Sequence, residues 1–114
     1  MSIFAELGSA ADSDVNAGIS ADVEPAIAAP SSNRTLRLVG YACREVAGSP
    51  AVASFNIVNG AAVSGGAALI PVELAANGSE CKWFGPEGIK FNSGISIEVV
   101  AGTVDVTLFY KETD

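Results

Sequence analysis

Few residues of this chain could transfer a proton or attack a substrate near neutral pH. The sequence has no histidine, so acid–base chemistry at pH 7 would depend on carboxylates or cysteine. The glutamates that fall among the expected strands are Glu73, Glu80, Glu87 and Glu98. Nothing in their spacing pairs two of them as glycoside hydrolysis requires, and we expect them on solvated strand faces and in loops. We therefore predict no catalytic residue and no enzymatic activity.

The other reactive side chains also lack the patterns that chemistry requires. Neither Gly8-Ser9 nor Ser64-Gly65-Gly66 resembles a nucleophile elbow or a phosphate-binding loop. Cys43 and Cys81 stand alone, without a CxxC pair, so no ligand set for a metal and no cofactor is predicted. Two alternatives stay open for these thiols: small buried hydrophobic side chains, or a mutual disulfide.

Composition restricts the class of partner. The 114 residues give room for one domain, and the formal net charge of −7 argues against nucleic acid, which attracts clustered Lys and Arg. The apolar stretches are too short to span a bilayer, and no signal peptide is recognised at the N-terminus. Hydrophobic residues make up 49% and charged residues 17% of the chain. Such a chain buries more than it solvates, or it covers surface against protein partners.

Residues 1–33 differ in composition from the rest. They contain five acidic residues and no Lys or Arg, and they are rich in Ala, Ser, Asp and Gly without a sustained period. We predict an extended or disordered acidic arm that is not packed into the domain core. The arm is either an inert tail or a segment that becomes ordered on a partner subunit. Ile3, Phe4 and Leu7 favour the second alternative, because a purely solvating tail seldom begins with an apolar cluster.

Residues 34–114 are predicted to form a single β-sandwich or jelly-roll-like domain, so the fold class is all-β. Short apolar runs alternate with turn residues every eight to twelve positions. The expected strands cover residues 35–41, 52–58, 67–74, 80–84, 89–91, 95–99 and 103–110. Asn59-Gly60 suits a tight turn, and Pro71 predicts an edge strand or a bulge. The last two runs, joined by Ala101-Gly102, are predicted to pair as a hairpin whose residues Ile97, Val99, Val104, Val106 and Leu108 face inward.

Two groups of residues in this domain are candidates for a protein interface. Trp83 and Phe84 form the densest aromatic point and could either anchor an interface or fill the core. Arg34, Arg37 and Arg44 lie on or beside the first expected strand and could form salt links, or could line a solvated face. The candidate interface residues are Ile3, Phe4, Leu7, Arg34, Arg37, Trp83 and Phe84.

The body of the chain resembles small virion proteins of tailed bacteriophages. The resemblance is carried by a GP-x-GI-x-F-x-x-GI segment at residues 85–95 and a VV-x-G-x-VDVT-x-FY segment at residues 99–110. An Ala- and Gly-rich body and a low-complexity arm precede them. The chain looks most like a capsid decoration, or cement, protein. The pattern marks turns and strands, so no individual functional residue is transferred by it.

The resemblance implies a β-sandwich that clusters, often as trimers, over junctions between coat subunits and tightens the shell. The expected partners are thus a major capsid protein or other virion subunits and further copies of this chain, with neither nucleic acid nor membrane. The expected location is the virion, after synthesis in the host cytoplasm. Similar β modules occur in phage tails, adaptors and fibres, which is one alternative. The other is a ligand-binding module for carbohydrate, with Trp83 and Tyr41 as a stacking platform.

Overall fold

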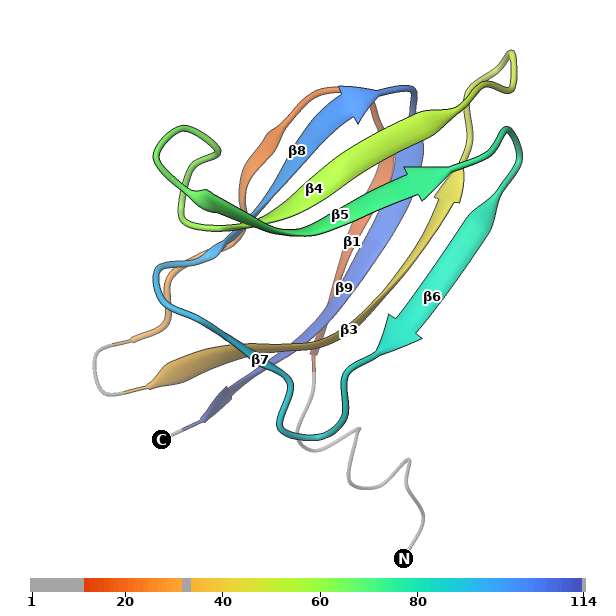
Figure 1. Cartoon of the computed structure of the whole chain (residues 1–114). Coiled ribbons are helices and arrows are strands. Elements are labelled where there is room, and N and C mark those ends of the chain that lie inside the picture. The colour runs from red at the N-terminus through yellow and green to blue at the C-terminus, as the bar shows by residue number, and fades with distance from the viewer. Residues whose placement is uncertain (1–11, 32–33, 114) are drawn as a thin grey trace, which may run out of the picture.

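A computed structural model describes residues 12–31 and 34–113, and every regular element in these ranges is a β-strand (Figure 1). The strands are β1 (Asp12–Ile19), β2 (Val23–Ile27), β3 (Thr35–Glu45), β4 (Ala53–Asn59), β5 (Ala67–Leu74), β6 (Ser79–Trp83), β7 (Ile89–Phe91), β8 (Ile95–Ala101) and β9 (Val104–Thr113). The predicted all-β class is confirmed.

The strands form two antiparallel sheets that face each other. Sheet A has the order β1-β9-β3-β6, with β7 also paired to β3, and sheet B has the order β2-β8-β4-β5. At matching positions the sheets hold consecutive strands: β1 with β2, β9 with β8, β3 with β4, and β6 with β5. Because each pair is joined by a connection that crosses from one sheet to the other, the chain wraps as a jelly roll.

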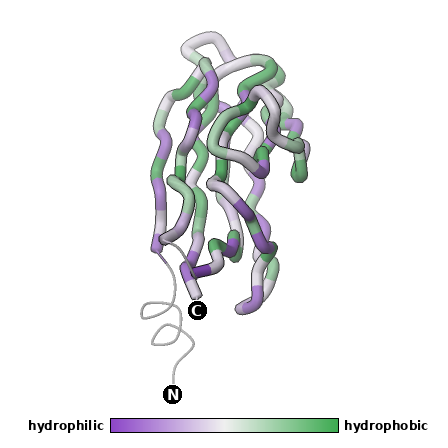
Figure 2. The backbone as a smooth tube through the Cα atoms, turned by 90° about the vertical axis from the view of Figure 1, so that its left-hand side faces the viewer, coloured by the Kyte–Doolittle hydropathy of each residue, from purple (hydrophilic) through white to green (hydrophobic). Residues whose placement is uncertain are grey.

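The core lies between the sheets and follows from the alternation of side chains along the strands. Figure 2 shows hydrophilic and hydrophobic residues following one another along the tube. The buried cluster comprises Ile27, Leu36, Leu38, Tyr41, Cys43, Ala53, Phe55, Ile57, Val72, Leu74, Phe91, Ile95, Ile97, Val104, Val106 and Leu108. Val99 is partly buried against this cluster. The predicted inward face of the last two strands is therefore confirmed.

The predicted arm boundary at residue 33 is wrong, because β1 and β2 are part of the sandwich. β1 pairs with β9 along sheet A, and β2 pairs with β8 in sheet B. Ile19 and Val23 pack against the core, and Ile27 belongs to it. Asp, Asn and Gly in β1 have low strand propensity, so pairing with β9 rather than local preference holds this strand in place.

The predicted hairpin of the last two strands is also wrong. β8 pairs with β2 and β4 in sheet B, whereas β9 pairs with β1 and β3 in sheet A. The connection at Gly102 therefore crosses between the sheets. In both arrangements each strand buries one face in the core. Alternation of apolar and polar residues along two consecutive strands therefore does not distinguish a hairpin within one sheet from a crossing between two sheets.

Turn chemistry was predicted with mixed success. Pro71 lies on β5, an edge strand of sheet B, as its missing N–H requires. Asn77 has a φ of 60°, which places it in the left-handed region at the β5–β6 connection. Asn59-Gly60 does not form a tight turn, because residues 60–66 separate β4 from β5. In that connection the positive φ belongs to Gly65.

Candidate functional site

The outer face of sheet A, on the side away from the core, carries exposed and partly buried residues arranged in rows. Strand register places directly opposed residues on one face, so the face can be read as rows across β1, β9, β3 and β6. The aromatic row is Ser13, Phe109, Gly40 and Trp83, and the small row is Val15, Thr107, Ala42 and Cys81. The ion-pair row is Asp105, Arg44 and Ser79. We refer to these three rows together as the binding face.

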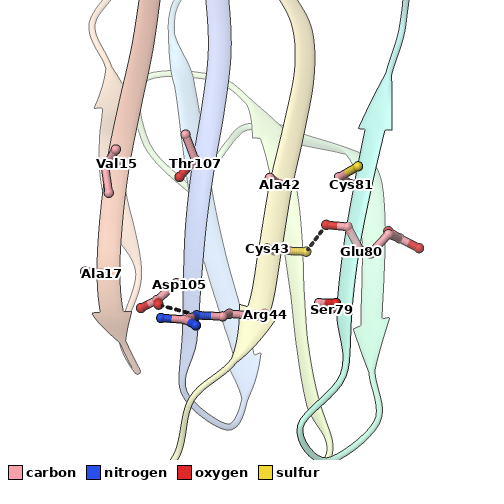
Figure 3. Close-up of a pocket in the computed structure, with 10 residues that line it drawn as sticks. All are labelled: Val15, Ala17, Ala42, Cys43, Arg44, Ser79, Glu80, Cys81, Asp105 and Thr107. Carbon is pink, nitrogen blue, oxygen red and sulfur yellow. Dashed lines mark hydrogen bonds and ion pairs between the residues drawn. The ribbon is translucent and has the colours of Figure 1, made fainter.

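A shallow depression of about 460 Å³ lies over the small row and the ion-pair row (Figure 3). Its lining includes Val15 and Ala17 from β1, Ala42 from β3 and Cys81 from β6. Val15 is 67% exposed. The depression is open to solvent and mostly lined by small side chains, which fits the side chain of a protein partner better than an enclosed small molecule.

Trp83 belongs to this face and not to the core. Its side chain is 48% exposed, so the interpretation of Trp83 as core volume is wrong. A Cβ at Gly40 would lie 3.1 Å from Cε3 of Trp83 and 2.7 Å from the carbonyl oxygen of Lys82. The indole thus lies against the sheet at the one position in its row without a side chain. Phe84, by contrast, is partly buried against the core.

Tyr41 lies on the opposite side of β3 from this face. It is buried, its ring is 6.0 Å from that of Phe84, and its hydroxyl donates a hydrogen bond to Glu80. Burial and this hydrogen bond raise the pKa of Tyr41 well above its ordinary value. A stacking platform made by Trp83 and Tyr41 is therefore not formed. The aromatic neighbour of Trp83 in its row is Phe109, which is partly buried.

In the ion-pair row, the carboxylate of Asp105 accepts hydrogen bonds from two partners. Oδ2 of Asp105 accepts a 3.0 Å hydrogen bond from Nε of Arg44, and Oδ1 accepts one of 2.7 Å from the N–H of Gly18. The N–H of Gly18, followed by Arg44, lowers the pKa of Asp105. Arg44 is largely exposed, so this pair contributes only about 0–1 kcal/mol to stability and mainly orients the two side chains.

A basic row borders the aromatic row. Lys111 on β9 lies opposite Arg37 on β3, and Arg37 lies opposite Lys90 on β7. Leu36 and Leu38 on either side of Arg37 are buried, so the three cations point away from the core. Arg37 also donates a 3.2 Å hydrogen bond to the carbonyl oxygen of Glu87.

The remaining predicted interface residues are not gathered at the binding face. Arg34 precedes β3 and donates a 2.9 Å hydrogen bond to the carbonyl oxygen of Glu112, at the far end of sheet A. Ile3, Phe4 and Leu7 lie outside the described residues. The structure therefore brings together Arg37 and Trp83, on neighbouring rows, and separates Phe84 from them.

The two cysteines have different environments and are not bonded to each other. Cys43 is buried, its thiol donates to the carbonyl oxygen of Glu80, and burial raises its pKa to about 11. Cys81 is exposed on the small row. The alternative of a disulfide is wrong, and so is burial for Cys81. The register explains both results, since Cys43 opposes Glu80 and Cys81 opposes Ala42, which puts the thiols on opposite faces.

Within residues 12–31 and 34–113, no group of three or more His, Cys, Asp or Glu side chains could hold a metal ion. None of the described segments is a helix long and apolar enough to cross a membrane. The carboxylate with the most backbone contacts is Glu45, which accepts hydrogen bonds from the N–H groups of Asn77 and Ala47 at 2.8 and 2.7 Å. Through the bond to Asn77, Glu45 ties the end of β3 to the connection between β5 and β6. Glu45 does not line the depression on the binding face.

Most residues of the binding face were not predicted as interface residues, among them Val15, Gly40 and Phe109. Phe109 could have been found, because Val104, Val106 and Leu108 were predicted to face inward and alternation then places Phe109 outside. Val15 was missed because its strand was taken as part of the arm. Gly40 has no signal in the sequence, since its role is to leave room for an indole from another strand.

Comparison of the chain with protein-family models and with curated proteins finds no match.

Proposed function

We propose that this chain is a structural protein that acts by binding other protein subunits through the outer face of sheet A. Following the resemblance in its sequence, the proposed setting is the phage virion, where the chain acts as a capsid decoration protein that self-associates as a trimer. The observation that carries the proposal is the exposure of Val15 and Trp83 at 67% and 48% on one continuous face. These two side chains lie on the edge strands β1 and β6, and the partly buried Phe109 and Ala42 lie between them. Exposed apolar side chains gathered on one face of a small domain are typical of surfaces that a partner covers.

The composition of the face supports a protein partner. Aromatic and arginine side chains are enriched where protein interfaces gain most of their free energy. The binding face contains Trp83, Phe109 and Arg44, and Arg37 lies in the neighbouring basic row. The small residues between them, Gly40 and Ala42, allow another backbone to approach closely. The jelly-roll fold alone does not decide the question, because that fold occurs in capsid proteins and in lectins.

The test compares two exposed valines. Val15 on the binding face and Val100 on β8 of sheet B have similar exposure, 67% and 62%. Val15→Glu is expected to weaken self-association and attachment to capsids about tenfold or more, because a charge would be buried at the contact. Val100→Glu serves as the matched control and is expected to change neither. Sedimentation velocity measures self-association, and co-sedimentation with capsids assembled from the coat protein of the same genome measures attachment.

Two results would contradict the proposal. A full chain that stays monomeric at every concentration and binds no capsid would remove it. Equal effects of Val15→Glu and Val100→Glu would show that the outer face of sheet A is not the contact surface.

The exposure of Trp83 also favours a second candidate, a carbohydrate-binding module in which the indole stacks on a sugar ring. The chain has one Trp, so its fluorescence reports on this position alone. Self-association is expected to shift the emission to shorter wavelength as protein concentration rises, because the indole leaves water. A shift produced by sugars, with no dependence on protein concentration, would favour the carbohydrate module.

A further inference from the structure

The positive charges of this acidic chain are distributed unevenly between the two sheets. All six Lys and Arg residues lie on strands of sheet A or directly before one: Arg34, Arg37, Arg44, Lys82, Lys90 and Lys111. The strands of sheet B contain none, and their charged residues are Glu24, Glu73 and Glu98. The strands of sheet A also carry acids: Asp12, Asp14, Glu45, Glu80, Asp105 and Glu112. By the strand register, only Asp105 of these lies on the outer face, against four bases there, Arg37, Arg44, Lys90 and Lys111. The outer face of sheet A is therefore the surface on which an acidic partner is attracted.

Three of these cations form the basic row, which borders the aromatic row. Lys111, Arg37 and Lys90 oppose one another across β9, β3 and β7, and the next row along β9 and β3 holds Phe109 and Gly40. Because neighbouring rows on one face are about 7 Å apart along a strand, a single extended segment can contact both. A segment that complements both rows would carry apolar side chains for the aromatic row and, next to them, a carboxylate for the basic row. It would have no Lys or Arg.

The chain itself contains such a segment. Residues 1–11 include Ile3, Phe4 and Leu7, with Glu6 among them and no Lys or Arg. The segment joins the sandwich at Asp12, which pairs with Tyr110 beside Lys111. Asp12 therefore marks the end of sheet A where the basic row lies. Eleven residues span up to about 36–40 Å when extended, more than the width of four strands at about 4.8 Å spacing.

The direction of β1 favours a neighbouring copy as the acceptor. β1 runs from Asp12, opposite Tyr110, toward Ile19, opposite Val104. The direction of β1, taken backward from Asp12, thus points past the basic row and away from the aromatic and small rows of the same sheet. Reaching those rows in the same copy would require the segment to reverse, whereas a neighbouring copy placed beyond that end is reached without a reversal.

We propose that residues 1–11 of one copy bind the outer face of sheet A of a neighbouring copy. Ile3, Phe4 and Leu7 contact the aromatic and small rows, and Glu6 faces the basic row. Such a contact joins two different surfaces, so repeating it around a rotation axis closes a ring, as a trimer requires. This inference rests on the proposed function, because it names the partner of the same face.

Crosslinking of the full chain tests the contact directly. A photoreactive benzoylphenylalanine replaces Phe4, and ¹⁴N- and ¹⁵N-labelled chains are mixed before irradiation. We expect crosslinks between light and heavy chains that map to peptides containing Trp83 or Phe109. Crosslinks confined to single chains, or crosslinks that map to sheet B, would overturn the proposal.

A charge exchange provides a second, independent measurement. Glu6→Lys is expected to weaken self-association about two- to fivefold, and the double change Lys90→Glu with Lys111→Glu is expected to do the same. Combining the three changes is expected to restore most of the lost affinity. Lys82→Glu is the control, because Lys82 opposes Tyr41 and lies outside the basic row. Equal weakening by the control, or no recovery in the combination, contradicts the assignment of Glu6.

The outcomes also separate this inference from the proposed function. If Val15→Glu weakens capsid attachment while crosslinks from position 4 avoid sheet A, the face binds a different partner and only the present inference fails. If the full chain neither self-associates nor attaches to capsids, both fail.

Discussion

Glu45 illustrates how one side chain can organise a connection. Its two carboxylate oxygens accept hydrogen bonds from the N–H groups of Asn77 and Ala47, and these bonds lower the pKa of Glu45 below its ordinary value of 4.5. Asn77 has a positive φ, so the carboxylate supports a conformation that is otherwise unfavourable. The network is specific to the ionised form, since a protonated or amide group provides weaker acceptors.

Stability is therefore predicted to depend on the ionisation of Glu45. The folded pKa is lower than the unfolded pKa, so the stabilisation is present above about pH 4.5 and is lost as the pH falls through the folded pKa. Glu45→Gln is expected to lower the melting temperature at pH 7, and this difference is expected to shrink as the pH falls below about 4. Thermal unfolding of both proteins across this range measures it. Glu73→Gln, at an exposed position on β5, is the control and should differ little from the parent at any pH.

The cysteines are expected to react with thiol reagents at very different rates. Cys43 is 6% exposed, and burial raises the pKa of its thiol to about 11, so little thiolate is present at neutral pH. Cys81 is exposed. In the folded protein one thiol should react rapidly, and Cys81→Ser should remove this fast phase while Cys43→Ser retains it. Rapid reaction of both thiols would show that β6 separates from β3.

At the scale of the elements, the crossing between β8 and β9 depends on Gly102. This residue has a φ of 80°, and a Cβ there would lie 2.7 Å from Cβ of Ala53. Gly102→Ala combines a strained backbone, about 1–2 kcal/mol, with an overpacked contact, about 1–3 kcal/mol. We therefore expect a loss of about 2–5 kcal/mol in the free energy of unfolding, measured by denaturant titration.

Gly65 separates these two contributions. Its φ is 86°, but a Cβ there would meet nothing within 4 Å. Gly65→Ala should therefore cost only the backbone strain, about 1–2 kcal/mol. If Gly102→Ala lowers the free energy of unfolding no more than Gly65→Ala does, then the β8–β9 connection moves enough to relieve the contact with Ala53.

The core face of β9 gives a complementary prediction. Val106 is fully buried between the sheets, so Val106→Ala removes buried apolar surface and leaves a cavity. We expect a loss of about 1–3 kcal/mol in the free energy of unfolding. Val100→Ala, at a position 62% exposed, should change it by less than about 0.5 kcal/mol. An unchanged melting temperature for Val106→Ala would contradict the assigned face.

The elements show which parts of the fold the sequence could predict. Residues 67–74 and 89–91 were predicted with the observed bounds of β5 and β7, because Pro and Gly turns delimit them. The sheet partners of β8 and β9 could not be predicted, since alternation records which face is buried and not which strand lies beside it. β1 was missed for a related reason: its pairing with β9 is a tertiary interaction that overrides a composition unfavourable to strands.

The candidate site was even less accessible to sequence reasoning. Trp83 could be recognised from the sequence as a candidate anchor, but the sequence does not tell which face of the sheet it lies on. A shift of one residue in the pairing of β6 with β3 would move its side chain from the outer face to the core. The basic row combines residues 37, 90 and 111, which only the pairing of three strands brings together. Such a row has no signature in the linear sequence.

At the scale of the whole molecule, the separation of charge has a measurable consequence. The bases lie on or beside sheet A, while residues 1–11 and the strands of sheet B carry acids only. If these surfaces meet when copies associate, attraction between them contributes to the affinity, and salt screens it. Raising ionic strength from about 0.1 M to about 1 M shortens the Debye length from about 10 Å to about 3 Å.

Self-association of the full chain is therefore predicted to weaken several-fold over that range of sodium chloride, as measured by sedimentation velocity at a fixed protein concentration. The variant with Lys90→Glu and Lys111→Glu should associate more weakly at low salt and lose most of this dependence, because the charges that salt screens have been reversed. Burial of the aromatic and small rows is not screened, so the residual affinity at high salt should depend on Val15 and Trp83. An association that salt leaves unchanged in the parent protein would mean that apolar contacts alone hold the copies together, and the basic row would then have no part in assembly.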